Sequence, residues 1–150
     1  MNANFFDDLR SLLQGVTAFL PSEEEIRNLF WGRTNDLWEM ATSLASFGCE
    51  IIVIKRGGRG QYVYERATGK KWEIPAYPAR LVDPTGAGDV FCGGFLAGYA
   101  ATLDPLQAAM RGNISASFCI EGSGAFYPLD SMPGLAQARL ESLSNLVRQV

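Results

Sequence analysis

The segment at residues 50–55, which reads EIIVIK, constrains the fold of this chain more than any other segment. Its β-branched residues stand at consecutive positions, so apolar and polar residues do not alternate. A strand of this kind is covered on both faces, as in sheets that lie between layers of helices. The sequence therefore predicts an α/β fold with this strand buried inside it.

Helical stripes and turn residues divide the rest of the chain into elements. A short apolar run at 16–20 predicts a second buried strand. The alternating segments 61–65 and 71–74 predict an antiparallel hairpin at the edge of the sheet. Helices are predicted at residues 3–14, from 22 onward, and at 35–47, 87–101, 105–120 and 134–148. This order predicts a layered, partly parallel sheet with flanking helices, in one domain over residues 1–150.

The composition argues against several classes of function. The chain has 150 residues, a net charge of −3 and no histidine. Without histidine, Ser–His–Asp and Cys–His catalysis and most zinc sites are excluded, so a general base has to be Asp, Glu, Lys or Tyr. The absence of a basic cluster argues against a nucleic-acid partner, and no apolar run is long enough to predict a membrane span. The N-terminal residues do not resemble a secretory signal, which predicts a cytoplasmic location.

Residues 82–91 join a Pro-punctuated loop to an apolar helix. Gly86, Ala87 and Gly88 are small, and backbone N–H groups at the start of a helix favour an anion. Asp89 lies in the first turn, where a carboxylate beside an anion makes sense if it takes a proton from the attacking nucleophile. The residues thus favour phosphoryl transfer, with Asp89 as general base and the three preceding amides as anion hole. The alternative is a plain helix N-terminus with an acidic residue that favours the dipole.

A family resemblance extends this interpretation. Residues 83–95, which read DPTGAGDVFCGGF, closely resemble the C-terminal signature of the ribokinase-like (PfkB) carbohydrate kinases. Residues 19–25 look like the Asn-x-x-Glu region of that family, 54–60 like its strand followed by Gly-x-x-Gly, and 113–125 like its adenine-pocket helix and loop. Members of the family are about twice as long. The resemblance therefore implies a ribokinase-like α/β fold of which this chain is the C-terminal half.

The resemblance implies an ATP-dependent kinase that phosphorylates a hydroxyl group of a sugar or sugar-like molecule. Asp89 would deprotonate that hydroxyl, and the three residues before it would stabilise the transferred phosphate. Glu25 would order Mg²⁺ through water, with Ser22 in place of the family's Asn. Ser22 and Glu25 also fit a capping box, in which they serve only the helix N-terminus. Both interpretations of this pair stay open.

The resemblance also implies nucleotide and cation sites. Gly57 and Gly60 would let the chain pass close to ATP, and Lys55 would reach it from the end of the buried strand; a tight turn with solvated charges is the alternative. Further nucleotide contacts are predicted at Asn113, for which a helix-surface position is the alternative, and at Gly122. The predicted ligands of a monovalent cation such as K⁺ are Asp83, Thr85, Ile120, Ser123 and Ala125.

Two alternative functions remain. One is a nucleotide-binding half-module that has no catalysis on its own, and the other is a kinase for a nucleoside or a vitamin-type alcohol. The family places most sugar contacts in its other half, so the acceptor stays undefined. Half of a sheet would expose apolar surface and an open edge, which predicts a homodimer or aggregation.

Overall fold

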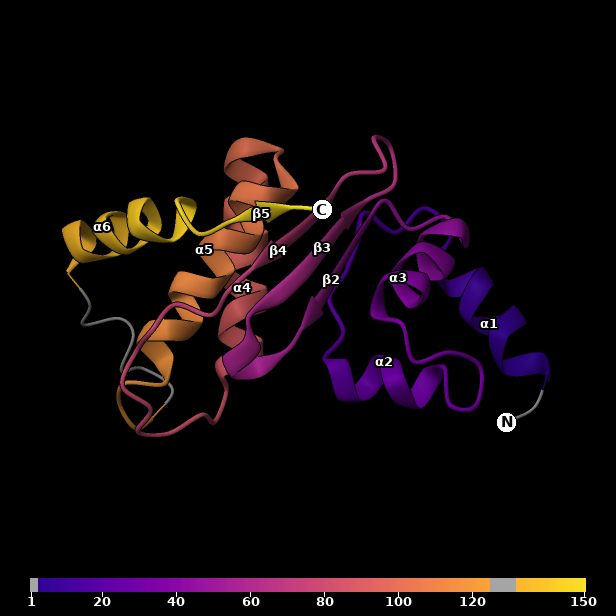
Figure 1. Cartoon of the computed structure of the whole chain (residues 1–150), viewed down its shortest axis with the longest axis horizontal. Coiled ribbons are helices and arrows are strands. Elements are labelled where there is room, and N and C mark those ends of the chain that lie inside the picture. Colours follow the sequence, from indigo (N-terminus) through magenta and orange to yellow (C-terminus); the bar gives the residue numbers. More distant parts are fainter. Residues whose placement is uncertain (1–2, 125–131) are drawn as a thin grey trace.

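The computed structural model describes residues 3–124 and 132–150, and within them one five-stranded sheet runs in chain order (Figure 1). Its strands are β1 (Ala18–Phe19), β2 (Ile51–Lys55), β3 (Gln61–Glu65), β4 (Lys71–Ile74) and β5 (Arg148–Gln149). The β1–β2 pair is parallel, and the other three pairs are antiparallel. The partly parallel sheet with an antiparallel hairpin is therefore confirmed.

Helices cover both faces of this sheet. The helices are α1 (Ala3–Leu13), α2 (Glu23–Leu29), α3 (Leu37–Ser46), α4 (Ala87–Thr102), α5 (Pro105–Cys119) and α6 (Pro133–Ser144). Figure 1 shows α1, α2 and α3 on one side of the sheet and α4, α5 and α6 on the other. Among the described residues, no helix has both the length and the apolar character that crossing a membrane requires.

The residues of β2 divide alternately between the two layers. Ile51 and Val53 pack with residues of α4 and α5, whereas Ile52 and Ile54 pack with residues of α1, α2 and α3. All four side chains are at most 3% exposed. The prediction that this strand is covered on both faces is confirmed, and only its last residue, Lys55, is partly exposed.

Helices α4 and α5 approach each other closely through glycine. A Cβ on Gly94 would lie 2.4 Å from Ser115 Oγ, and one on Gly98 would lie 3.0 Å from Ala108 Cα. Neither position has room for a Cβ atom. This explains why α4 contains glycines, although each costs about 1 kcal/mol in a helix interior. This packing fixes the first turn of α4 relative to α5.

The C-terminal segment differs from the prediction. The last helix ends at Ser144, not at residue 148, and Arg148–Gln149 pairs with Trp72 and Glu73 of β4. The predicted hairpin is thus covered by β5 and does not form the edge of the sheet. A strand of two residues is too short to show an alternation of apolar and polar side chains, and Arg148 lies 75 positions from its partner Glu73. No local pattern could therefore reveal this strand.

Candidate functional site

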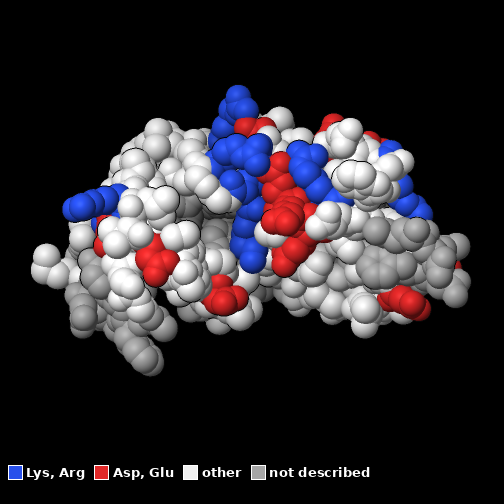
Figure 2. All heavy atoms as spheres, turned by 90° about the horizontal axis from the view of Figure 1, so that it is seen from below, with Lys and Arg blue, Asp and Glu red and all other residues white. Residues whose placement is uncertain are grey.

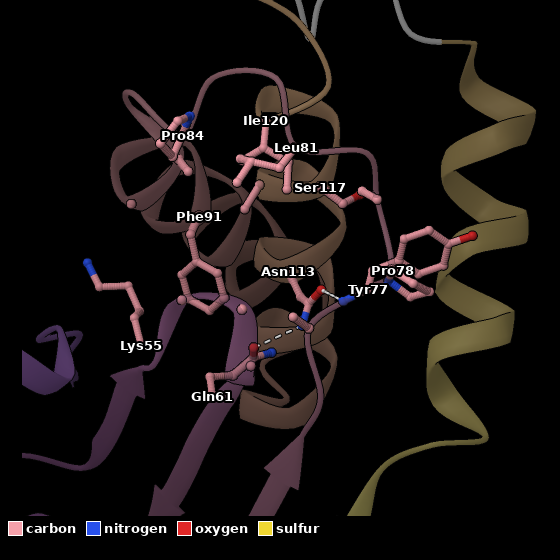
Figure 3. Close-up of a pocket in the computed structure, with 18 of the residues that line it drawn as sticks. Lys55, Gln61, Tyr77, Pro78, Leu81, Pro84, Phe91, Asn113, Ser117 and Ile120 are labelled. Carbon is pink, nitrogen blue, oxygen red and sulfur yellow. Dashed lines mark hydrogen bonds between the residues drawn. The ribbon is translucent and has the colours of Figure 1, made fainter.

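A pocket of about 650 Å³ opens at the C-terminal end of β2 (Figure 3). Its walls come from the end of β2 with the turn that follows it, from residues 76–81 after β4, from the first turns of α4 and from one face of α5. This volume lies within the range of about 300–1,000 Å³ that is typical of small-molecule sites. The pocket brings together most of the segments that the sequence singled out.

The start of α4, from which Ala87 and Gly88 line this pocket, carries free backbone donors. Gly86 is the N-cap with a φ of +79°, a left-handed conformation that glycine adopts without strain. The N–H of Ala87 donates to the Pro84 carbonyl at 3.1 Å, whereas those of Gly86 and Gly88 have no acceptor within the described part of the chain. Asp89 stands in the same turn with an exposed side chain. Uncommitted donors at a helix N-terminus and a carboxylate therefore lie side by side.

Lys55 brings a positive charge to the same place. Its Nζ lies 3.6 Å from Cys92 Sγ, one turn further along α4. The same Nζ would lie 3.7 Å from a Cβ built on Gly88. Lys55 is half-buried and lines the pocket, as Figure 3 shows, so its charge faces the helix N-terminus. The structure thus joins the predicted nucleotide contact at Lys55 with the predicted anion hole at Gly88.

Ser22 and Glu25 form the capping box. Glu25 Oε2 accepts the backbone N–H of Ser22 at 2.6 Å, and Ser22 Oγ accepts the N–H of Glu25 at 3.2 Å. The backbone and side-chain hydrogen bonds with Ser22 hold the pKa of Glu25 below its ordinary value, with a smaller contribution from the Lys55 ammonium and against the effect of burial. Glu25 therefore caps α2 and also lies within electrostatic reach of the positive charge at the pocket.

Glu23, which no sequence pattern singled out, accepts hydrogen bonds from three arginines. One carboxylate oxygen accepts from Arg27 at 2.8 Å, and the other accepts from Arg56 at 3.1 Å and from Arg59 at 2.8 Å. Burial raises the pKa of Glu23, but the three guanidinium groups outweigh that effect and hold it below its ordinary value. Figure 2, a view from below Figure 1, shows basic and acidic side chains gathered side by side at the centre of the face that it presents. Through its ion pairs with Arg56 and Arg59, Glu23 holds α2 against the turn at residues 56–60, which forms one wall of the pocket.

Replacing Glu23 with Gln is expected to lower the free energy of unfolding by about 1–3 kcal/mol, because three guanidinium groups lose a shared, nearly buried counter-charge. The exposed neighbour Glu24→Gln, which makes the same charge change in the same helix turn, should alter it by about 0.5 kcal/mol or less. Urea unfolding of the two variants at neutral pH measures this difference. Equal stability of the two would contradict the assigned role of Glu23.

The cost of Glu23→Gln should also depend on pH. The folded-state pKa of Glu23 is lowered, so its charge stabilises the fold fully above the ordinary value of 4.5. That contribution is lost as the pH falls through the lower folded-state pKa. Unfolding curves taken from neutral to acidic pH should therefore converge for the variant and the original protein at the acidic end.

Asn113 is buried against the pocket wall, so its alternative placement on the helix surface is wrong. Its Nδ2 donates to Gln61 Oε1 at 2.9 Å, and its Oδ1 accepts the N–H of Tyr77 at 3.0 Å (Figure 3). Its Nδ2 also donates to the Pro75 carbonyl at 2.8 Å. Both amide hydrogens are thus committed within the protein. Asn113 holds the segment after β4 in place. Gly122 is also buried, but it is not among the residues that line the pocket.

The residues predicted for a monovalent cation gather at the C-terminal end of α5. Asp83 Oδ1 accepts the N–H of Thr85 at 2.9 Å, Ser123 Oγ donates to Asp83 Oδ2 at 3.5 Å, and the Ile120 carbonyl accepts the N–H of Asp83 at 3.2 Å. Hydrogen bonds from the side chain and backbone of Thr85 hold the pKa of Asp83 below its ordinary value. These contacts fix the loop before α4. Ala125 lies outside the described residues.

Comparison with known proteins gives relatives over most of the chain. A sugar kinase of Archaeoglobus fulgidus, itself uncharacterized, is 34% identical over 118 residues, which is 79% of this chain and 45% of that protein. The cytidine kinase of Thermococcus kodakarensis is 37% identical over 105 residues, which is 70% of this chain and 37% of that protein. The chain thus spans less than half the length of these curated relatives.

Solved structures share the fold. The ribokinase of Thermotoga maritima superposes with a TM-score of 0.73 at 24% identity, over 91% of this chain and 44% of that one. The Arabidopsis thaliana ribokinase complexed with ribose and ATP superposes with a TM-score of 0.75 at 22% identity, over 88% of this chain and 43% of that one. The ribokinase-like fold predicted from the sequence is confirmed.

A model of one family covers most of the sequence. The family is described as pfkB family carbohydrate kinase, and its model matches residues 1–132. This range includes the loop and first turn of α4, the turn after β2, and α5. The chain therefore belongs to the pfkB family of carbohydrate kinases.

Proposed function

We propose that this protein transfers the γ-phosphoryl group of ATP to a hydroxyl group of a sugar, either free or within a nucleoside. The observation that carries the proposal is the first turn of α4, where the uncommitted N–H of Gly88, the nearby Lys55 ammonium and Asp89 come together. Relatives that are named sugar kinase and cytidine kinase support this acceptor class. The breadth of these names leaves the individual sugar open.

In the proposed reaction, Asp89 accepts the proton of the acceptor hydroxyl. The hydroxyl oxygen forms a bond to the γ-phosphorus while the bond from that phosphorus to the oxygen shared with ADP breaks. Charge develops on the transferred group, and the N–H groups of Gly86 and Gly88 stabilise it together with the positive end of α4. The N–H of Ala87 supports the turn through Pro84 and contributes less to this anion hole.

Lys55 adds a mobile positive charge to these fixed dipoles. Its ammonium lies within reach of Gly88 and near Glu25, so it is placed to neutralise phosphate oxygens at the entrance to α4. A charge held in a partly buried pocket acts more strongly than one in bulk water. We infer that Lys55 contacts the β- or γ-phosphate and does not contact the base.

Glu25 fits the proposed role in Mg²⁺ binding. Its side chain is exposed, its lowered pKa keeps it ionised, and its capping bond to the backbone of Ser22 uses one carboxylate oxygen, Oε2. Carboxylate oxygens and water are the ligands that Mg²⁺ prefers. One protein of this fold, from Escherichia coli, was solved in complex with ATP and Mg²⁺. When bound, the ion would supply charge neutralisation for the phosphates.

Calorimetry of the chain with ATP and Mg²⁺ tests the nucleotide site. We expect binding with a dissociation constant between about 1 μM and 1 mM, the usual range for enzyme substrates. Omission of Mg²⁺ should weaken binding, because the phosphates then face Glu25 and Asp89 with only the Lys55 ammonium to offset the repulsion. No heat of binding at about 5 mM ATP, above that range, would overturn the proposal.

A kinase assay with ribose, cytidine and related alcohols then separates the two classes of function. ADP formation that depends on one of these acceptors supports the kinase. ATP binding without turnover of any acceptor supports the nucleotide-binding half-module instead. The assay thus decides between catalysis and binding once the nucleotide site is established.

A further inference from the structure

Arg139 of α6 reaches the pocket from outside the residues that the family model matches. Its guanidinium donates to Ser117 Oγ at 2.8 Å and to Glu121 Oε2 at 2.7 Å, and its side chain is only 9% exposed. Ser117 itself lines the pocket from α5. A buried cation on the last helix is therefore bonded directly to a residue of the pocket wall.

Two aromatic rings enclose the same guanidinium. Arg139 Cζ lies 4.0 Å from the centre of the Phe118 ring and 5.0 Å from the centre of the Tyr77 ring. Planar guanidinium groups interact favourably with aromatic faces at these separations. Figure 3 shows the Tyr77 ring directed toward α6 at the side of the pocket opposite Lys55. Arg139 thus holds both Tyr77 and Ser117 at one end of the pocket.

The arrangement is specific but is not optimised for stability. Within the described residues, the buried Nε of Arg139 has no hydrogen-bond partner. An unpaired buried donor is unfavourable, and apolar residues of similar volume often replace a buried ion pair without loss of stability. Some buried polar groups instead serve to select one arrangement of their neighbours. The neighbours here are the two pocket-wall residues Tyr77 and Ser117.

The two ends of the pocket differ in chemistry. Lys55 and the free N–H of Gly88 define an end suited to phosphate. Tyr77 and Pro78 lie on the opposite side of the pocket and give it an apolar wall there (Figure 3). A nucleotide has the same polarity, with charged phosphates and a flat base. The end that Arg139 supports is therefore the end that suits the base.

We propose that Arg139 is a positioning residue for nucleotide recognition, which fixes Tyr77 and Ser117 where the base of ATP binds. This inference rests on the proposed nucleotide site. It assigns base affinity to a contact between α6, α5 and the segment after β4. Arg139 does not touch the reacting phosphate. Its loss should therefore weaken the binding of the base and leave the binding of the phosphates unchanged.

The test compares ATP with inorganic tripolyphosphate, which occupies only the phosphate end. In Arg139→Met, ATP affinity should fall about tenfold, the effect of misplacing one favourable contact, while tripolyphosphate affinity stays within about twofold. Arg139→Lys keeps the charge near Glu121 but loses the planar fork. Its ATP affinity should therefore lie between those of the original protein and Arg139→Met. Arg148→Met serves as the control, since Arg148 lies on the exposed strand β5 and pairs with Glu73 of β4. That control should bind both ligands normally.

A second measurement does not depend on nucleotide binding. The N–H of Tyr77 donates to Asn113 at 3.0 Å, so its hydrogen exchange reports whether the wall stays in place. Exchange should accelerate in Arg139→Met and not in Arg148→Met. Unchanged ATP affinity in folded Arg139→Met, or equal loss for ATP and tripolyphosphate, would overturn the proposal. If the original protein binds neither ligand, the nucleotide site itself fails, and unchanged exchange at Tyr77 would still refute the positioning role separately.

Discussion

Asp89→Asn is expected to lower kcat by a factor of about 10²–10⁴, the contribution typical of a general base. Asn keeps the size and hydrogen-bonding shape of the side chain but cannot accept the hydroxyl proton. ATP affinity should stay the same or increase, because the carboxylate that is removed lies in the turn whose N–H groups we propose to bind the phosphate. Steady-state kinetics with the acceptor, together with calorimetry for ATP, measures the two effects separately.

The matched control for this substitution is Asp104→Asn. Asp104 also stands at a helix N-terminus, where its Oδ1 accepts the N–H groups of Leu106 and Gln107 at 2.8 and 3.2 Å. Asn is as good an N-cap as Asp, so kcat should remain within about twofold of the original value. If both substitutions lowered kcat equally, or if neither did, Asp89 would act only on the helix dipole and the general base would have to be sought elsewhere.

Local sequence patterns predicted the elements that carry the site. Consecutive β-branched residues identified β2, the spacing of Ser22 and Glu25 identified the start of α2, and the small residues before Asp89 identified the turn into α4. Each of these signals is complete within a few positions, because backbone conformation and capping depend on near neighbours. The same locality explains why the residues at the β2 end of the pocket, where we propose that phosphate binds, could be singled out from the sequence.

The opposite end of the pocket could not be predicted in this way. Asn113 and Gln61 are 52 positions apart, and Arg139 and Ser117 are 22 apart, so these contacts arise only from the packing of α5 and α6 on the sheet. One signal was present in the sequence. Gln61 shares a face of β3 with the buried Val63, and a polar residue at an inward position needs a hydrogen-bond partner. The pattern indicates that a partner exists but not which residue it is.

Gly60→Ala is expected to lower the free energy of unfolding by about 3 kcal/mol or more. Gly60 has φ +85° and ψ −139°, a conformation that is essentially restricted to glycine. A Cβ there would lie 2.0 Å from the Ile74 carbonyl oxygen and 2.6 Å from the Pro75 carbonyl carbon. These atoms belong to the backbone, so no side-chain rotation relieves the clash. The loss corresponds to a fall in Tm of about 6–12 °C for a chain of this size.

Gly58→Ala is the control in the same turn. A Cβ on Gly58 meets no atom within 4 Å, and its φ lies outside the left-handed range, so stability should change by about 0.5 kcal/mol or less. Gly60→Ala should also weaken ATP binding, because the displaced Ile74–Ala76 backbone leads directly into the wall that Asn113 and Tyr77 form. Thermal unfolding and calorimetry on both variants measure these effects. Equal Tm values for Gly60→Ala and Gly58→Ala would show that the backbone at Gly60 can accommodate a methyl group without loss of stability. The close approach of the β2–β3 turn to that wall would then not define the pocket.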